Sequence, residues 1–363
     1  MKILYITNGI HGAGGLERVL SVKASYLADV LGHEVHIVVL NNKGASLFYT
    51  FSAKIQLHQV VVTGNPFRYV WQYITGMRAS VATLKPDVIS VCDDGLKGFF
   101  LPLLLPKIPI IYERHVSKQM AYGVNPSPLK RLRVGIQLQL MTRLGRTFDK
   151  FVVLTQDNLQ EWNLPNAVVI ANPLSFYPEN QSSLTNKTVI AVGKHTYQKG
   201  FDRLLHSWAA ILQTQPDWIL EIYGKADEKQ RLYQLAKQLQ IDNSVRFFEP
   251  VPDIATRFLA SSVFAFSSRF EGFGMVLIEA MACGVPCVSY DCPCGPSDII
   301  RSGEDGFLVS NNDTVAFTQQ LLQLIENREL RLKMGAQAKI NVQRYLLEVV
   351  VKQWDELFKS LAS

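Results

Sequence analysis

Residues 188–202 read TVIAVGKHTYQKGFD. The first five form a short, unbroken apolar run, as strands do when both faces of a parallel sheet are covered. A loop with two glycines follows, and then a helical pattern from Phe201 to Gln213. Residues 3–7, ILYIT, begin the chain in the same way, ahead of a helical pattern from Glu17 to Leu31. The sequence therefore begins a parallel α/β unit twice.

Each half continues with further apolar runs between helical stretches. In the first half the predicted strands are Ile3–Thr7, Val35–Leu40, Ile55–Val62, Val88–Cys92, Ile108–Tyr112 and Phe151–Leu154. In the second half they are Thr188–Val192, Ile219–Tyr223, Val245–Phe247, Val263–Phe266, Cys287–Tyr290 and Gly306–Val309. The predicted fold class is α/β, with two doubly wound, Rossmann-like domains. Because such sheets bind ligands at the carboxyl ends of their strands, we expect the domains to face each other across a cleft.

The domain boundary is predicted from a polar, proline-containing stretch without periodicity, Phe176 to Lys187, which we interpret as the linker. We expect an N-terminal domain over 1–172, a C-terminal domain over 173–344 and a C-terminal helix over 345–363. The helix is indicated by apolar residues at helical spacing, namely Val349, Trp354, Leu357 and Phe358.

Composition suits a folded protein of about two domains. The chain has 363 residues, 48% of them hydrophobic and 19% charged. With 37 Lys and Arg against 31 Asp and Glu, the formal charge is +6. The first 180 residues contribute 18 − 11 = +7, and the remaining residues contribute 19 − 20 = −1. A basic half suits nucleic acid, an anionic membrane or a phosphate-bearing substrate. No recognised nucleic-acid-binding module is present, so we expect no nucleic-acid partner.

No segment predicts a signal peptide or a membrane-spanning helix. The first eight residues are interpreted as a buried strand, and the most apolar stretch, 99–112, is broken by three prolines and a lysine, well short of the roughly 20 residues that span a bilayer. Four of the five cysteines lie between Cys283 and Cys294 without CxxC spacing. We expect reduced thiols and no zinc site, which fits the cytoplasm.

A glycine-rich loop follows the first strand. Residues 9–18 read GIHGAGGLER and open a helix, which leaves backbone N–H groups free to bind an anion. The second strand does not end on the acidic residue that a dinucleotide-binding fold uses for the ribose, which disfavours NAD. The alternative is a tight turn that needs glycine for its backbone angles alone.

The most specific motif is at 269–286, which read RFEGFGMVLIEAMACGVP. Glu271 is predicted in a loop, and the N–H groups near Gly274 open a helix whose positive end suits a diphosphate. Glu279 then falls just over one turn into that helix. From there a carboxylate can accept paired hydrogen bonds from the hydroxyls of a ribose, and Glu271 can do so for a sugar ring. The predicted donor-binding residues are Glu279, Gly14, Gly15, Gly272, Phe273, Gly274, Met275 and Val276.

Two lysines, Lys194 and Lys199, follow the strand at 188–192. Both could reach one pyrophosphate. The alternative is a solvated surface pair, but their place at the carboxyl end of a strand favours the ligand-binding interpretation.

These motifs together resemble the retaining glycosyltransferases of family 4, which have the GT-B fold, over essentially the whole chain. Glu271 and Glu279 match the family's E-x7-E motif, Lys199-Gly200 its K-G, and Gly14-Gly15-x-Glu17 its G-G-x-E loop. The resemblance implies that Glu271 holds donor-sugar hydroxyls, Glu279 the ribose, and Lys199 with Lys194 the diphosphate. Lys194 stands where the family more often has Arg, so the bidentate fork is lost there.

Further parts of the chain extend the resemblance. His115 follows a strand, at a position where the family often places a histidine against the donor sugar. The resemblance therefore implies a catalytic set of Glu271, Lys199, His115 and Lys194. The alternative for His115 is an ordinary loop histidine. Residues 291–298, DCPCGPSD, resemble the C-G-P variant of enzymes that build bacterial surface polysaccharides. In GT-B enzymes the C-terminal helix returns to the N-terminal domain.

The implied function is transfer of a hexose or N-acetylhexosamine from a nucleotide-diphosphate sugar, with UDP favoured, to a sugar hydroxyl of a lipid-linked or polysaccharide acceptor. Lysines and helix N–H groups would stabilise the leaving diphosphate, so we expect no metal or other cofactor, and Asp93-Asp94 is interpreted as a strand-end turn. The alternatives are a GT-B sugar-nucleotide epimerase and an inactive sugar-nucleotide-binding homologue. The motif combination argues against the first, and the intact Glu271, Glu279 and Lys199 argue against the second.

The basic half also predicts a membrane contact. Apolar residues from Leu129 to Leu144 are flanked by cations, which suits an anionic membrane surface; the cations are Lys118, Lys130, Arg131, Arg133, Arg143 and Arg146. Residues 66–73, PFRYVWQY, mix aromatics with Arg and are predicted to line the path of a lipid-linked acceptor. The alternative is a solvated helix face over a core stripe. We therefore expect a cytoplasmic enzyme, peripheral on the inner face of the plasma membrane.

Overall fold

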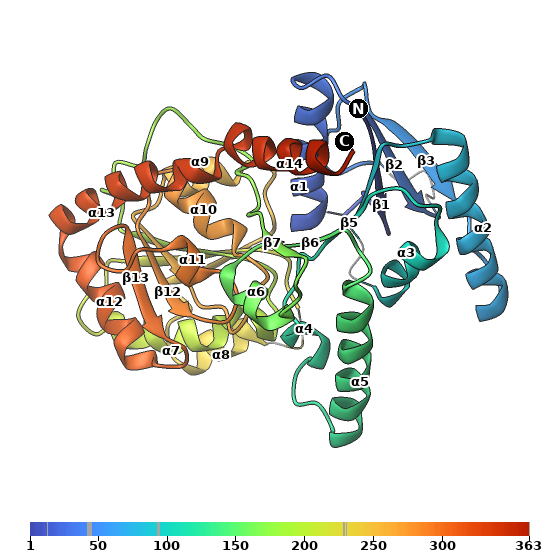
Figure 1. Cartoon of the computed structure of the whole chain (residues 1–363). Helices are drawn as coiled ribbons and strands as arrows, with labels where there is room; N and C mark the ends of the chain where they lie inside the picture. The colour runs from blue at the N-terminus through green and yellow to red at the C-terminus, as the bar shows by residue number, and fades with distance from the viewer. Residues whose placement is uncertain (13, 42–45, 93–94, 228, 230, 363) are drawn as a thin grey trace. The chain divides into compact units, whose positions relative to one another are not determined.

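The computed structural model describes residues 1–12, 14–41, 46–92, 95–227, 229 and 231–362. It divides into two compact units, Met1–Ser175 with Leu347–Ser363, and Phe176–Leu346 (Figure 1). Each unit contains one parallel sheet covered by helices on both faces. The predicted fold class, two doubly wound α/β units, is confirmed.

The N-terminal unit holds a seven-stranded parallel sheet in the order β3-β2-β1-β4-β5-β6-β7. The strands are β1 (Lys2–Thr7), β2 (Glu34–Leu40), β3 (Gln56–Val60), β4 (Val88–Cys92), β5 (Ile110–Glu113), β6 (Lys150–Val153) and β7 (Ala167–Val169). The order reverses between β1 and β4, so this pair marks a switch point. The sequence did not predict β7, because this edge strand is three residues long and only half-buried.

Two layers of helices cover that sheet. One face packs against α2 (Pro66–Leu84), η1 (Leu96–Phe100), α3 (Leu101–Leu104), α5 (Pro128–Gly145) and α6 (Gln156–Trp162). The other packs against α1 (Gly15–Asp29) and the C-terminal helix α14 (Leu347–Ala362), which lies beside α1 in Figure 1. A short helix, α4 (Gln119–Tyr122), precedes α5.

The C-terminal helix begins later than predicted. Tyr345 ends a 3-10 turn, η4 (Val342–Tyr345), and Leu346 is extended, so α14 starts at Leu347. Its buried face is formed by Val350, Val351, Trp354 and Phe358. Val349, which was predicted on the apolar face, is exposed instead.

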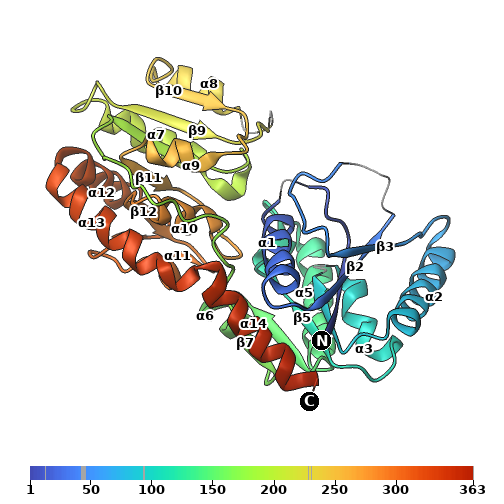
Figure 2. The same cartoon turned by 90° about the horizontal axis from the view of Figure 1, so that it is seen from above.

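The C-terminal unit holds a six-stranded parallel sheet in the order β10-β9-β8-β11-β12-β13. Its strands are β8 (Thr188–Val192), β9 (Ile219–Tyr223), β10 (Val245–Phe248), β11 (Val263–Phe266), β12 (Cys287–Asp291) and β13 (Gly306–Ser310). Figure 2 shows β10 at one edge of this sheet, beside α8 (Leu232–Gln238). The order reverses between β8 and β11, which makes these two strands the switch point of this unit.

Helices also cover both faces of this second sheet. They are η2 (Tyr197–Lys199), α7 (Phe201–Ile211), α9 (Ile254–Leu259), α10 (Met275–Ala282), α11 (Pro296–Ile299), α12 (Thr314–Glu326) and α13 (Arg328–Asn341). Both sheets are therefore built so that loops at the carboxyl ends of their central strands can carry a binding site.

The stretch predicted as the linker is fastened to the C-terminal unit. The Lys339 ammonium donates to three of its backbone carbonyls, those of Pro178, Glu179 and Asn180, at 2.7–2.9 Å. The Ser182 amide donates to the Cys283 carbonyl at 2.8 Å. The stretch therefore belongs to the C-terminal unit and is not free chain between domains.

Candidate active site

The switch point of the C-terminal unit brings together two predicted motifs. One loop, 193–200, follows β8, and the other, 267–274, follows the neighbouring strand β11. Gly200 has φ +63°, and a Cβ there would lie 2.1 Å from the Ser267 carbonyl oxygen. Only glycine therefore fits at this position, which explains the glycine of the K-G motif in terms of contact between the two loops.

Lys199 and Glu271 form an ion pair at this point. The distance from Lys199 Nζ to Glu271 Oε1 is 2.7 Å, and the side chains are 19% and 7% exposed. The side-chain amide of Gln198 donates to the Phe270 carbonyl at 3.1 Å. The backbone N–H of Glu271 donates to the Pro293 carbonyl at 3.0 Å, which ties the Glu271 loop to the C-G-P segment. A cation and a carboxylate thus lie together at the carboxyl ends of β8 and β11. Lys194, five residues before Lys199, is exposed.

The second loop leads directly into α10. Gly274 is its N-cap, with φ +102°, a backbone conformation that glycine adopts without strain. Met275 and Val276 are half-buried in the first turn, while Gly272 and Phe273 are buried before it. Glu279, four residues after Met275, is buried in α10 at 1% exposure. The predicted donor-binding residues of this motif therefore lie around one helix N-terminus.

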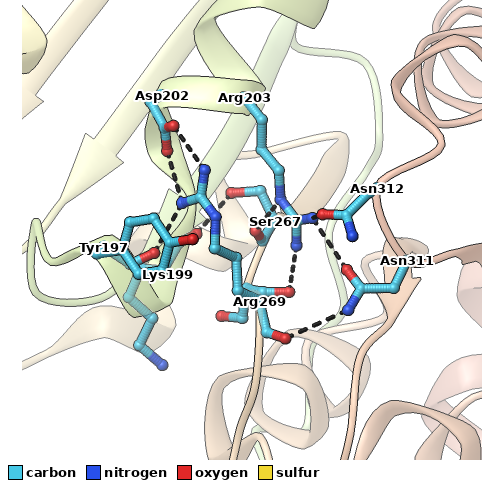
Figure 3. A network of polar contacts seen from close by, with 9 residues as sticks. Tyr197, Lys199, Asp202, Arg203, Ser267, Arg269, Asn311 and Asn312 are labelled. Atoms are coloured by element: carbon cyan, nitrogen blue, oxygen red, sulfur yellow. Dashed lines mark hydrogen bonds and ion pairs between the residues drawn. The ribbon is translucent and has the colours of Figure 1, made fainter. Parts of the chain in front are cut away.

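A network that the motifs did not predict holds these loops in place (Figure 3). The buried Arg203, from α7, donates to the carbonyls of Ser267 and Ser268 and to the side chains of Asn311 and Asn312. Its guanidinium lies 3.7 Å from the centroid of the Tyr290 ring. Burial lowers the pKa of Arg203 to about 10. The first two residues after β11 are thereby fixed to α7 and to the loop after β13.

A second arginine, Arg269, fastens the same loop to the start of α7. It makes two bonds to the Asp202 carboxylate, at 2.8 and 2.6 Å, and donates to the Tyr197 carbonyl at 2.7 Å. Burial alone would raise the pKa of Asp202, but the hydrogen bonds from Arg269 lower it below its ordinary value. In Figure 3 the Lys199 ammonium points away from both arginines. These cations therefore position the loop, and Lys199 is left to face Glu271.

Two glycines of the glycine-rich loop in the N-terminal unit lie against Glu17. A Cβ on Gly12 or on Gly14 would lie 2.4 Å from an oxygen of the Glu17 carboxylate. No glycine of this loop has a positive φ, so the alternative of a turn that needs glycine for its backbone angles alone is wrong. Gly12 and Gly14 instead leave room for the carboxylate at the positive end of α1, whereas a Cβ on Gly9 or Gly15 would meet nothing within 4 Å. Gly14 caps that helix and Gly15 begins it, while Ala13 lies outside the described residues.

His115 lies in the N-terminal unit, two residues beyond β5. Its Nε2 is 3.2 Å from Glu113 Oε2, and Glu113 in turn pairs with Lys23 from α1. The structure thus places His115, Gly14 and Gly15 in one unit and the remaining predicted site residues in the other.

One group of side chains offers metal ligands among the described residues: Cys92, Glu113 and His115 have ligand atoms within 4.8 Å of one another. Glu113 Oε2, which would face a cation, already lies 2.5 Å from the Lys23 ammonium, and Ser90 donates to Oε1 at 2.5 Å. The ammonium would repel a metal ion, so this group does not fit one. Asp93 and Asp94 lie outside the described residues.

Comparison with known proteins identifies the family. Residues 13–174 match the family model "Glycosyltransferase Family 4", and residues 176–341 match "Glycosyl transferases group 1". An uncharacterised glycosyltransferase of Haemophilus influenzae is 31% identical over 97% of this chain and 98% of its own length. The chain belongs to glycosyltransferase family 4. One further relative is also a glycosyltransferase, and a solved structure shares the fold.

The amylovoran biosynthesis glycosyltransferase AmsD of Erwinia amylovora is 29% identical to this family 4 chain over 98% of it and 99% of AmsD. Among solved structures, HepE of Anabaena in complex with UDP-glucose superimposes with a TM-score of 0.79 at 20% identity, covering 99% of this chain and 100% of HepE. The protein is a transferase with the GT-B fold, of the type found in bacterial surface-polysaccharide synthesis.

Proposed function

We propose that this protein is a retaining glycosyltransferase that moves a hexose or N-acetylhexosamine from a UDP-sugar to a sugar hydroxyl of a lipid-linked or polysaccharide acceptor. The observation that carries the proposal is the Lys199–Glu271 pair at the switch point of the C-terminal unit, beside the N-terminus of α10. The solved complex of HepE with UDP-glucose supports UDP as the nucleotide, and the name of AmsD supports a polysaccharide product.

In this proposal the chain's own cations stabilise the leaving group. The bond from the sugar C1 to the β-phosphate oxygen breaks, and a bond from C1 to the acceptor hydroxyl oxygen forms on the same face. The acceptor proton passes to the leaving phosphate. Lys199, Lys194 and the first N–H groups of α10 balance the charge that grows on the diphosphate, so no metal ion is needed. Glu271 accepts hydrogen bonds from hydroxyls of the donor sugar.

Metal-free nucleotide binding is the first test. We expect UDP to bind the wild type in EDTA, and Glu279→Gln to weaken that binding about 10-fold or more, because a charged hydrogen bond contributes about 1.5–3 kcal/mol. Isothermal titration calorimetry with UDP, GDP and ADP measures both effects. Binding that disappears in EDTA contradicts metal independence, and no binding of any nucleotide at millimolar concentration contradicts the proposal.

Retention of the donor's anomeric configuration is tested separately, from the linkage in the product. With a UDP-sugar and an acceptor glycan, proton NMR of the fresh product gives the anomeric configuration of the new linkage. An α-linked donor that yields a β-linked product would contradict a retaining enzyme while leaving the transferase assignment intact.

The surface of α5 supports a location at an anionic membrane. Leu138 and Met141 form its buried stripe, but a second apolar stripe, Leu129, Leu132, Ile136 and Leu140, is exposed. Lys130, Arg131, Arg133, Arg143 and Arg146 are exposed as well. A core stripe alone does not explain exposed apolar residues three and four positions apart, whereas an interface helix has both apolar side chains and cations exposed.

Two details of the membrane prediction are corrected by the structure. Lys118 is half-buried, and its ammonium already has partners, because it donates to the Glu161 carbonyl at 2.8 Å and lies 4.3 Å from the centroid of the Trp162 ring. Burial lowers its pKa. In the 66–73 stretch, which begins α2, Phe67, Val70 and Trp71 are exposed, but Tyr73 belongs to the core.

If α5 binds a membrane, charged substitutions on its exposed apolar stripe should abolish vesicle binding. Leu132 and Ile136 are 62% and 59% exposed, so replacing both with Glu should leave the fold intact but remove binding to vesicles that contain anionic phosphatidylglycerol. Cosedimentation measures this, with Val315→Glu, an exposed apolar residue of α12, as the matched control. Equal binding of wild type and double variant would contradict the assignment. Among the described residues no helix is long and apolar enough to cross a bilayer.

A further inference from the structure

A buried charged cluster lies beneath His115 in the N-terminal unit. Lys23 Nζ is 2.5 Å from Glu113 Oε2, and both side chains are 1% exposed. Ser90 donates to Glu113 Oε1 at 2.5 Å. The Lys23 ammonium also lies 3.8 Å from the centroid of the Trp354 ring, which belongs to α14. Four elements, α1, β4, β5 and α14, therefore contribute to holding one carboxylate.

That carboxylate is ionised. Burial alone would raise the pKa of Glu113, but the charge of Lys23 and then the hydrogen bond from His115 lower it well below its ordinary value. An ionised carboxylate can only accept hydrogen bonds. His115 Nε2, at 3.2 Å from Oε2, must therefore carry the hydrogen that it donates. In a neutral imidazole the other nitrogen, Nδ1, is then an acceptor.

The acceptor nitrogen is left for a ligand. The His115 side chain is only 9% exposed, and His115 Nδ1 is buried with no hydrogen-bond partner among the described residues. A buried polar atom without a partner is costly in a folded protein, so it indicates a group that binds there. Because Glu113 is already balanced by Lys23, the cluster has no net charge that would attract an anion or a metal ion.

We propose that Glu113 is a positioning residue, which holds His115 as the Nε2–H tautomer so that Nδ1 accepts a hydrogen bond from a sugar hydroxyl. This inference rests on the proposed function, the transfer of a sugar from a UDP-sugar, and adds to it a contact between His115 and a sugar hydroxyl. It also specifies the chemistry of that contact: a neutral acceptor nitrogen binds a hydroxyl, whereas a diphosphate oxygen would need a donor at the same place. His115 therefore distinguishes the sugar from the nucleotide.

The tautomer is tested on the wild-type protein. Long-range proton–nitrogen NMR of protein labelled with ¹⁵N-histidine, with His115→Gln to assign the signal, reports which ring nitrogen carries hydrogen. We expect hydrogen on Nε2 and none on Nδ1 at pH 8. Hydrogen on Nδ1, or on both nitrogens, overturns the proposal. So does a change at His115 on adding Zn²⁺ or Mn²⁺, since that would assign the group to a metal.

The role in sugar binding is tested with Glu113→Gln. A glutamine can also donate, so the tautomer lock is lost. We expect the KM for the UDP-sugar to rise or kcat to fall by about 10-fold or more, with UDP affinity within about twofold of wild type. The matched control is Glu161→Gln, which changes a half-buried carboxylate of the same unit that accepts a hydrogen bond from Ser117. Equal losses for UDP and UDP-sugar, or no loss for either, overturn the proposal.

The design separates this inference from the proposed function. If Glu113→Gln does not fold because Lys23 is left unpaired, Lys23→Met/Glu113→Gln removes both charges together, and the wild-type spectrum still decides the tautomer. A wild type that transfers sugar but shows the other tautomer defeats only the inference. A wild type that transfers no sugar from any nucleotide sugar defeats the proposed function, whatever the tautomer.

Discussion

Glu271→Gln is expected to lower the rate of sugar transfer about 100-fold while leaving the affinity for UDP within about threefold. The substitution keeps the shape of the side chain but removes its charge, and a hydrogen bond to a charged group contributes up to about 3 kcal/mol, which is roughly a factor of 100 in rate. Glu271 lies 2.7 Å from Lys199, so the variant also releases the lysine from its ion pair. Steady-state kinetics with a UDP-sugar and calorimetry with UDP measure the two quantities.

Lys199 provides the comparison for this variant. Because Lys199 is proposed to bind the diphosphate and Glu271 the sugar, Lys199→Met should weaken UDP binding, whereas Glu271→Gln should not. Glu329→Gln, on the exposed face of α13, controls for the loss of a carboxylate elsewhere in the unit. If Glu271→Gln transfers sugar at the wild-type rate, or if both variants lose UDP equally, the separate roles of the two residues are wrong.

The sequence was sufficient to predict the sheets because most of their strands are covered on both faces. The runs at 188–192 and 219–223 coincide with β8 and β9 residue for residue. Burial on both faces demands unbroken apolar sequence, and such runs are visible without a structure. β7 lacks this signal, since all three of its residues are half-buried at the sheet edge.

The motifs located the loops of the candidate site, but not what holds them. Arg203 reads in the sequence as an ordinary helical cation, yet its partners are backbone carbonyls 64 and 65 residues later. Lys118 was predicted on the surface, but it is half-buried and its ammonium contacts Glu161 and Trp162. Spacing in sequence reveals neighbours on one helix or loop, whereas a buried cation is satisfied by whatever the tertiary fold brings to it.

The Lys23–Glu113 pair also joins residues far apart in sequence, at a separation of 90, and it predicts the largest effect on stability. Lys23→Met leaves Glu113 charged and buried without a cation, which costs about 3–5 kcal/mol. For a unit of this size that corresponds to a fall of roughly 10 °C in Tm. Methionine fits the volume and packs well against Trp354 and Tyr5, so the loss reports the charge and not a cavity.

The pH dependence distinguishes lost charge pairing from lost packing. In the wild type the pKa of Glu113 is lower in the folded than in the unfolded chain, so its contribution to stability is present above an unfolded pKa of about 4.3 and is lost as the pH falls towards the folded value. In Lys23→Met burial raises the pKa of Glu113, so the carboxyl takes up a proton on folding and its penalty disappears in acid. The difference in Tm between the two proteins should therefore be largest near pH 7 and shrink towards pH 4, and Lys23→Met/Glu113→Gln should recover more than half of it at pH 7. A difference that stays constant from pH 7 to pH 4, with no recovery in the double variant, would mean that Lys23 stabilises the unit by packing against Trp354 and not by its charge.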